Sequence, residues 1–478
     1  MSSRSRPREA AAGDPLGRRE CSLRAPRTFT HPGLLPHAVN SLGLLVGFLV
    51  VTFLGVVSGI ATGLSPGLHV NNVAALVLAT QSAWGAFIAG VVPGAVDPDT
   101  VGLLLACYLL ATAASHAVFD FIPSVFLGAP TEETALATLP GHRLLLMGQG
   151  AKAVALAARG AVLGTAFALV VVFPLRILLA DPVGLAERFR GWAPWFLVFV
   201  LAALLLSEAR GRKWRRVARA AWVQTLAAVL GIAVLRGISP LDSGVVLFPL
   251  FSGLFGLPSL LFGLRSRPGD IPSQRIEPLR ALSREDVGSA IRGTMAGASV
   301  SWLPGLSGGA AATLASLRFR KPIGPTQFMV VLGAVSTSTA LLSVAVLFMI
   351  HRARSGAAAA VAELLPDSGA WSNPLATPSS LLILLAASGL ATAVSAPLSA
   401  RVARFVANRW SASDPRHISA ASILVLILLL GFVTGGPGLA IAAVSTVVGL
   451  VPVALRVRRV HLMASLLVPV LIGSLVVA

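Results

Sequence analysis

The chain has 478 residues, of which 55% are hydrophobic and only 12% are charged. Soluble globular domains carry about 25% charged residues, so this composition excludes an ordinary soluble protein. The formal net charge of +19 would suggest a nucleic-acid partner in a soluble chain. Here the basic residues gather in short loops between apolar runs, which is the pattern of cytoplasmic loops in membrane proteins. We therefore expect membrane lipid, and no nucleic acid, among the partners.

Residues 1–38 are rich in Arg and Pro and contain no apolar core with a small-residue cleavage site. They predict a disordered basic cytoplasmic tail rather than a signal peptide. Apolar runs follow along the rest of the chain, and about 20 such residues cross a bilayer. The expected segments are 40–58, a broken pair near 59–92, 101–121, a short broken segment near 122–141, 160–180, 192–207, 217–237, 243–263, a second broken pair near 287–317, 327–350, 376–397, 417–434, 436–455 and 460–478.

This pattern predicts an all-α, polytopic integral membrane protein with about 10–13 transmembrane helices and broken or re-entrant hairpins. A polar cytoplasmic connection, 264–286, separates a first transmembrane half, 39–263, from a second half, 287–478.

The basic loops set the expected orientation, because Lys and Arg favour the cytoplasmic side. Loops that contain Asp97, Asp99 and Asp242 are then external, and the N-terminus is cytoplasmic. Segment 40–58 would run outward, 101–121 inward and 327–350 outward. The two halves are therefore expected to be inverted repeats.

Two stretches interrupt the apolar pattern in the same way. "GIATGLSPGLHVNNVAALV" and "GTMAGASVSWLPGLSGGAAATLA" each contain an apolar run, a Pro-Gly pair and then small or polar residues. Aligning Pro66 with Pro304 also aligns Gly59 with Gly297. Broken helices at matching places in inverted repeats mark the binding site of many secondary transporters.

Such a break has a chemical consequence. A Pro-Gly pair removes a backbone donor and permits the dihedral angles at which a helix restarts. The exposed N–H groups are tolerated only beside protein or a wet cavity, and together with the positive end of the new helix they can bind an anion. For a single kink, close helix packing through Gly59 and Gly63 is the alternative. The expected substrate-binding residues are Ser65, Pro66, Gly67, His69, Asn71 and Asn72 at the first break, and Pro304, Gly305, Ser307, Gly308, Gly309 and Thr313 at the second.

The segment "DFIPSVFLGAPTEETALATLPGHRLLLMGQGAKAV" places acids and hydroxyls in a mostly apolar setting. Ionisable residues at membrane depth are costly and usually functional. Residues 131–134 also fit a plain helix N-cap with acids in the first turn at the membrane surface, and the two interpretations stay open. The candidates for binding a coupling cation or proton are Asp120, Thr131, Glu132, Glu133 and Thr134.

This segment, together with "GLSPGLHVNNVAAL", "LPGLSGGAAATLA", "PLFSGLFGLPSLL" and "GLVPVALRVRRVHLMASLLVPVLI", resembles the large membrane subunit of tripartite tricarboxylate transporters. The resemblance covers the chain from about residue 40 onward and is greatest to the archaeal stand-alone branch of this TctA-type family. It implies a secondary transporter of small carboxylates, with a small membrane subunit and an extracytoplasmic binding protein as partners. The chain departs from the bacterial pattern at Glu132 and Glu133, which replace mostly neutral residues, and at His69.

We therefore expect a secondary active transporter of small organic anions in the plasma membrane, coupled to H⁺ or Na⁺, without enzymatic activity or a bound cofactor. A polyprenyl-phosphate translocase is the alternative, because "PGLSGG" also resembles a family thought to return this lipid carrier across the membrane. An integral-membrane enzyme is less favoured, since the sequence contains no HExxH motif and no serine nucleophile elbow.

Overall fold

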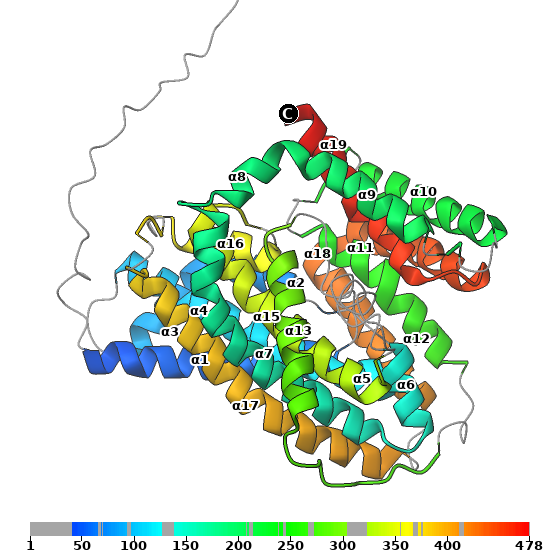
Figure 1. The fold of residues 1–478 in the computed structure, drawn as a ribbon, viewed down its shortest axis with the longest axis horizontal. Helices are drawn as coiled ribbons and strands as arrows, with labels where there is room; N and C mark the ends of the chain where they lie inside the picture. Colours follow the sequence, from blue (N-terminus) through cyan, green and yellow to red (C-terminus); the bar gives the residue numbers. More distant parts are fainter. Residues whose placement is uncertain are drawn as a thin grey trace, which may run out of the picture. The chain divides into compact units, whose positions relative to one another are not determined.

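The computed structural model describes residues 41–65, 68, 70–92, 97–126, 138–206, 208–209, 214–237, 239–241, 245–265, 272–303, 323–353, 355–366, 371–373, 376–410 and 415–477. All regular elements in these ranges are helices (Figure 1). Eight of them are long and apolar enough to cross a membrane, and two shorter apolar stretches are Leu247–Gly263 and Arg459–Gly473. The expected all-α polytopic fold is confirmed at this level.

The first half begins with a long helix, two short helices and another long helix. Asp97 begins α4, because its carboxylate accepts the Thr100 N–H at 2.8 Å and Pro98 occupies the first turn. The helix α7 starts ten residues before the apolar segment predicted from residue 160. The bounds are α1 Ser41–Leu64, α2 Val70–Ala79, α3 Gln81–Val91, α4 Pro98–Phe119, α5 Phe121–Phe126, α6 Thr138–Leu146 and α7 Gly150–Leu179.

The next elements complete the first half and include one π-helical turn, η2. Predicted segments 192–207 and 217–237 match α9 and α10 closely. The bounds are α8 Leu185–Phe189, η1 Arg190–Trp192, α9 Ala193–Leu206, α10 Trp214–Arg236, α11 Leu247–Phe251, η2 Ser252–Gly256 and α12 Leu257–Gly263.

In the second half, α18 is interrupted at Gly435, whose φ of 61° lies in the left-handed region. The predicted segments 417–434 and 436–455 match the two helical stretches on either side of this kink. Pro437 follows it. The bounds are α13 Arg284–Val300, α15 Pro325–Ile350, α16 Gly356–Leu364, α17 Ser379–Trp410, α18 Pro415–Ala454, η3 Arg459–Met463 and α19 Ala464–Val477.

Two helices, α4 and α15, form the centre of the protein. In their most apolar windows, 89% and 94% of the residues are buried, respectively, as expected for helices that are apolar on all sides. α1 and α17 pack along α4, and α13 and α7 pack along α15.

α1 and α4 run parallel. A Cβ at Gly55 would lie 2.8 Å from Ala111 Cβ, and a Cβ at Gly63 would lie 2.7 Å from Phe119 Cβ. The expected opposite directions of segments 40–58 and 101–121 are therefore wrong, because small residues allow parallel contact over the whole interface. Since parallel helices begin at the same membrane face, a cytoplasmic N-terminus and an external loop at Asp97 cannot both hold.

The helices form two groups. The core group contains α1 to α7, α13 and α15 to α17, and the peripheral group contains α9 to α12 with η2, α18, η3 and α19. Within the peripheral group, α10 packs on α19, and α11, η2 and α12 pack on α18. Among the described residues, contacts between helices of the two groups are few compared with those inside each group, and α8 and η1 connect α7 to α9.

A partly buried ionic cluster joins two parts of the peripheral group. Arg458 Nε lies 2.6 Å from Glu208 Oε1, and His461 Nε2 lies 3.3 Å from the same oxygen. His461 Nδ1 also lies 3.3 Å from Gln224 Nε2. The cluster holds the connection after α9, α10 and η3 together.

Candidate functional site

The first helix break lies where the sequence predicts it. α1 ends at Leu64, the Leu68 N–H donates to the Ser65 carbonyl at 3.2 Å, and α2 begins at Val70. The predicted residues Pro66, Gly67 and His69 lie outside the described residues.

The second predicted break also follows a helix end. α13 ends at Val300, and the Leu303 N–H donates to the Val300 carbonyl at 3.2 Å. The structure does not describe the remaining predicted residues, which are Pro304, Gly305, Ser307, Gly308, Gly309 and Thr313 at this break and Thr131, Glu132, Glu133 and Thr134 in the middle segment.

Asn71 holds the start of α16. Its Oδ1 accepts the Ala357 N–H at 3.1 Å, while the Ser355 hydroxyl accepts the Ala358 N–H at 3.1 Å. The first amides of a helix lack partners inside the helix, so both contacts stabilise α16. Asn71 therefore has a structural role beside the predicted one. Asn72 lies in α2, and its side chain is outside the described residues.

A cavity of about 430 Å³ lies at the first break. Pockets for small ligands have volumes in this range. Its polar side chains are Ser65, which the sequence predicts, and His417 and Ser422 of α18, which sequence reasoning missed. No motif marks His417 and Ser422. They also lie in the other half of the chain, so the sequence gives no reason to group them with Ser65. The lining residues are Leu64, Ser65, Leu68, His417, Ala421, Ser422, Val425 and Leu426.

Close packing fixes the end of α1 beside this cavity. A Cβ at Gly59 would lie 2.5 Å from Ser115 Cβ and 2.6 Å from the Thr112 carbonyl oxygen. The Ser115 hydroxyl donates to the Val56 carbonyl at 3.0 Å. The interpretation of Gly59 as a packing residue is confirmed, but packing does not account for the break that follows.

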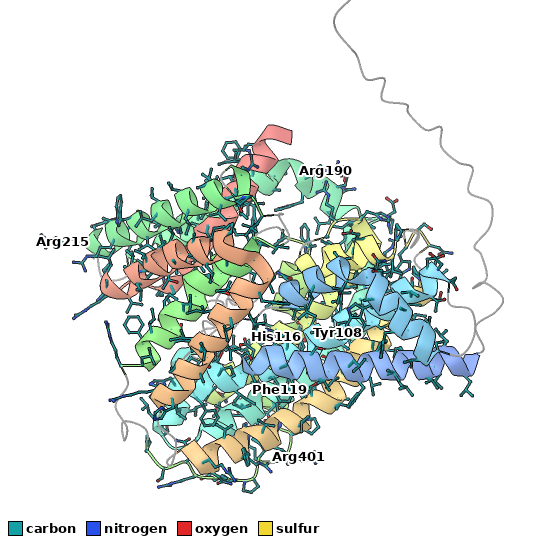
Figure 2. All side chains as sticks on the ribbon, turned by 180° about the vertical axis from the view of Figure 1, so that it is seen from behind. Tyr108, His116, Phe119, Arg190, Arg215 and Arg401 are labelled. Atoms are coloured by element: carbon teal, nitrogen blue, oxygen red, sulfur yellow. The ribbon has the colours of Figure 1, made fainter. Side chains whose placement is uncertain are left out.

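His116 lies at the same interface, near the C-terminal end of α1 (Figure 2). The residue is 3% exposed, and its Nδ1 lies 3.1 Å from Thr62 Oγ1. Asp120, one turn later, is 2% exposed. Sequence reasoning selected Asp120 and missed His116. The available signal was a second ionisable residue four positions earlier, on the same helix face.

The second half contains a similar arrangement on α15. A Cβ at Gly297 would lie 2.2 Å from Ser338 Oγ and 3.1 Å from Thr339 Oγ1. Thr339 Oγ1 is buried and makes no hydrogen bond within the described structure. Sequence reasoning missed this hydroxyl, which belongs to a run of four polar residues, 336–339, in a buried helix.

An ion pair fixes the start of α13 against α7. Asp286 is 1% exposed, and its Oδ2 lies 2.8 Å from Arg159 Nη1. Asp286 also forms a capping box with Ser283. Burial raises the pKa of Asp286, but the hydrogen bonds from Ser283 and Arg159 outweigh it, so the pKa lies below its ordinary value.

Comparisons with known proteins agree with this architecture. The family model of the tripartite tricarboxylate transporter TctA family matches residues 49–464. An uncharacterized protein of Methanocaldococcus jannaschii is 29% identical over 322 residues, which cover 66% of this chain and 72% of that protein. No solved structure matches the chain. The family match extends from α1 to the start of α19, and by it this multi-pass membrane protein belongs to the tripartite tricarboxylate transporter TctA family.

Proposed function

We propose that the chain is a secondary active transporter of small organic carboxylates, which bind at the first helix break. The observation that carries this proposal is the cavity beside Ser65. The cavity has one wall from α1 of the core group and another from α18 of the peripheral group. A ligand held between two groups with few mutual contacts is exposed to one side or the other when the groups move.

The chemistry of this place favours an anion. Leu68 lines the cavity and α2 begins at Val70, so the positive end of α2 lies close to the cavity. Unpaired N–H groups at a helix start carry partial positive charge and donate to carboxylates. Ser65, His417 and Ser422 supply further hydrogen-bonding groups.

A likeness between the two halves supports the proposal. The contact of α1 with α4 has a counterpart in the contact of α13 with α15. In each contact, two glycines one helical turn apart face two small residues that are also one turn apart, as expected of inverted repeats. Gly55 against Ala111 corresponds to Gly293 against Ala334, and Gly59 against Ser115 corresponds to Gly297 against Ser338.

The relative direction of the two halves supports inversion. α7 and α17 are antiparallel, because Thr165 Oγ1 donates to Thr392 Oγ1 at 3.3 Å while Leu169 lies beside Gly389.

The directions of α4 and α15 can be read from their contacts with α17 and α7. α17 is parallel to α4, since Ala391 clusters with Ala111 and Ala396 clusters with Val118. α7 is parallel to α15, since a Cβ at Gly160 would touch Val330 and a Cβ at Gly164 would touch Ala334. Because α7 and α17 are antiparallel, α4 and α15 are antiparallel as well. An antiparallel relation between corresponding helices, such as α4 and α15, is the arrangement of inverted repeats.

The coupling ion and the partners belong to the same proposal. We propose coupling to an H⁺ or Na⁺ gradient, because both can drive accumulation of an anion. A small membrane subunit and an extracytoplasmic binding protein are the proposed partners, on the ground that the family is named as tripartite.

The test is transport by the purified chain in liposomes, with radiolabelled citrate and succinate as probes and imposed pH or sodium gradients. We expect accumulation by the wild type and a loss of about tenfold or more in Ser422→Leu, which fills the cavity with three carbon atoms in place of one hydroxyl. The control is Ala440→Leu, which fills a different cavity of about 380 Å³ between α10 and α18. Equal uptake by wild type and Ser422→Leu would remove the proposed binding place. Movement of polyprenyl phosphate without carboxylate uptake in the same vesicles would instead establish the lipid alternative.

A further inference from the structure

We propose that His116 is a proton-binding residue of this transporter and that its protonation favours an anion at the first helix break. The inference rests on the proposed transport function and names the residue that couples it to a pH gradient. His116 lies in the most buried part of α4, where water cannot solvate a charge, so its protonation depends on its neighbours.

Thr62 is a hydrogen-bond partner of the imidazole, and its hydroxyl lies 3.1 Å from His116 Nδ1. The same hydroxyl lies within donating distance of the Ser58 carbonyl at 3.0 Å and of the Gly59 carbonyl at 3.3 Å. When the hydroxyl donates to either carbonyl, Thr62 Oγ1 accepts from His116 Nδ1. In this tautomer Nε2 is the atom that gains or loses a proton.

His116 is placed to act on the break. Thr62, its hydrogen-bond partner, lies one helical turn before Ser65, which lines the cavity. A Cβ at Gly63 would lie 3.0 Å from the His116 carbonyl oxygen, so the two helices are in backbone contact at this level. A positive charge on His116 adds to the positive end of α2 and attracts an anion in the cavity.

Among the described residues, few other titratable groups lie on the elements that pack around His116. α1, α5 and α15 contain no titratable side chain. Asp120 is the acidic neighbour on α4, one helical turn after His116, and is likewise buried. The remaining charged groups on helices that contact α4 are Arg401, Arg404 and Arg409 of α17, Lys152, Arg159 and Arg176 of α7, and Glu363 of α16.

The two halves of the chain differ at the position of His116. The alignment that pairs Ala111 with Ala334 places Thr339 opposite His116, and Thr339 does not titrate. Each transport cycle would therefore carry one imidazole proton, taken up beside the first break. Proton and anion binding at neighbouring places are reciprocally coupled, so each raises the affinity for the other.

The first test needs no substrate. Histidine-specific ¹⁵N labelling of the purified full chain in detergent gives imidazole resonances from its 8 histidines, and His116→Asn identifies that of His116. Asn is neutral and offers an amide N–H near the position of Nδ1, so the bond to Thr62 can persist. We expect the His116 resonance to titrate between about pH 5 and 8, and Thr62→Val to shift its midpoint. Thr62→Val also provides the assignment should His116→Asn fail to fold.

The second test separates coupling from binding. In liposomes with labelled citrate, we expect His116→Asn to lose pH-gradient-driven uptake by about tenfold or more, and the citrate exchange that remains without a gradient to lose the dependence on pH that the wild type shows. The matched control is His351→Asn. His351 is exposed, and its left-handed backbone conformation accepts Asn.

Three results would overturn the proposal. One is a His116 resonance that does not change across this pH range, and another is normal pH-driven uptake by His116→Asn. The third is wild-type uptake that follows a sodium gradient and ignores the pH gradient. If the wild type moves no carboxylate, the transport proposal fails, whereas the resonance still decides whether His116 binds a proton.

Discussion

Single glycines decide how closely the helices approach. At Gly59 even a methyl group would lie 2.6 Å from the Thr112 carbonyl oxygen, which belongs to the backbone of α4 and cannot rotate away. The absence of a side chain is therefore required for packing at this position, although Ala is normally the better helix former.

We expect Gly59→Ala to destabilise the protein by about 1–3 kcal/mol through overpacking. Thermal unfolding of the detergent-solubilised chain measures the effect. The control is Gly90→Ala in α3, where no atom lies within 4 Å of the added Cβ. A stability equal to the wild type in Gly59→Ala would contradict the described contact of α1 with α4.

The buried carboxylate of Asp286 gives a prediction about pH. We expect Asp286→Asn to cost about 1–3 kcal/mol near neutral pH, because it removes charge-assisted hydrogen bonds to Arg159 and Ser283. The folded-state pKa is depressed, so the stabilisation is present above the ordinary value of 3.8 and is lost as the pH falls through the folded value. The unfolding temperatures of variant and wild type should therefore converge in strong acid. Glu285→Gln, at a side chain that is 67% exposed, is the control.

At the scale of elements, the direction of α1 is the main result. Helices joined by two short helices and a turn can run parallel or antiparallel, and hydropathy is the same in both cases. The contacts of Gly55 and Gly63 show that α1 runs in the same direction as α4. α17 runs in the same direction as α4, and Arg401 lies in its C-terminal half (Figure 2). We therefore expect the end of α17 and the start of α1 at opposite membrane faces.

Cysteine labelling tests these directions. Leu42→Cys at the start of α1 and Asp99→Cys at the start of α4 should react with a membrane-impermeant maleimide from the same side. Arg404→Cys, near the end of α17, should react from the other side. The background chain carries Cys21→Ser and keeps Cys107, which is buried. Labelling of positions 42 and 99 from opposite sides would contradict the parallel packing.

The whole molecule consists of a core group that carries the first break and a peripheral group that completes the cavity. Each group contains helices from both halves of the chain, so the repeat and the structural division do not coincide. In the proposed transport cycle, movement of one group against the other would change the cavity and leave the densely packed centre around α4 and α15 intact.

A cross-link between the groups should therefore stop transport. We expect a short cleavable reagent that joins Ser65→Cys to Ser422→Cys to lower citrate uptake by about tenfold, with recovery after cleavage. The control is a disulfide between Thr165→Cys and Thr392→Cys, whose hydroxyls are 3.3 Å apart inside the core group. Inhibition by the control pair alone would mean that the moving boundary lies elsewhere.

The sequence by itself determined the helical membrane class, the position of most helices, the family and the location of both helix ends that precede a Pro-Gly pair. These properties depend on local hydropathy and on backbone restrictions at Pro and Gly, so a single segment contains the information. Only the tertiary structure decided that α1 and α4 are parallel, that Asn71 caps α16, that His417 and Ser422 share a cavity with Ser65 and that His116 meets Thr62. Each of these depends on contact between segments distant in the chain, where small residues and complementary shapes, rather than hydropathy, select the partner.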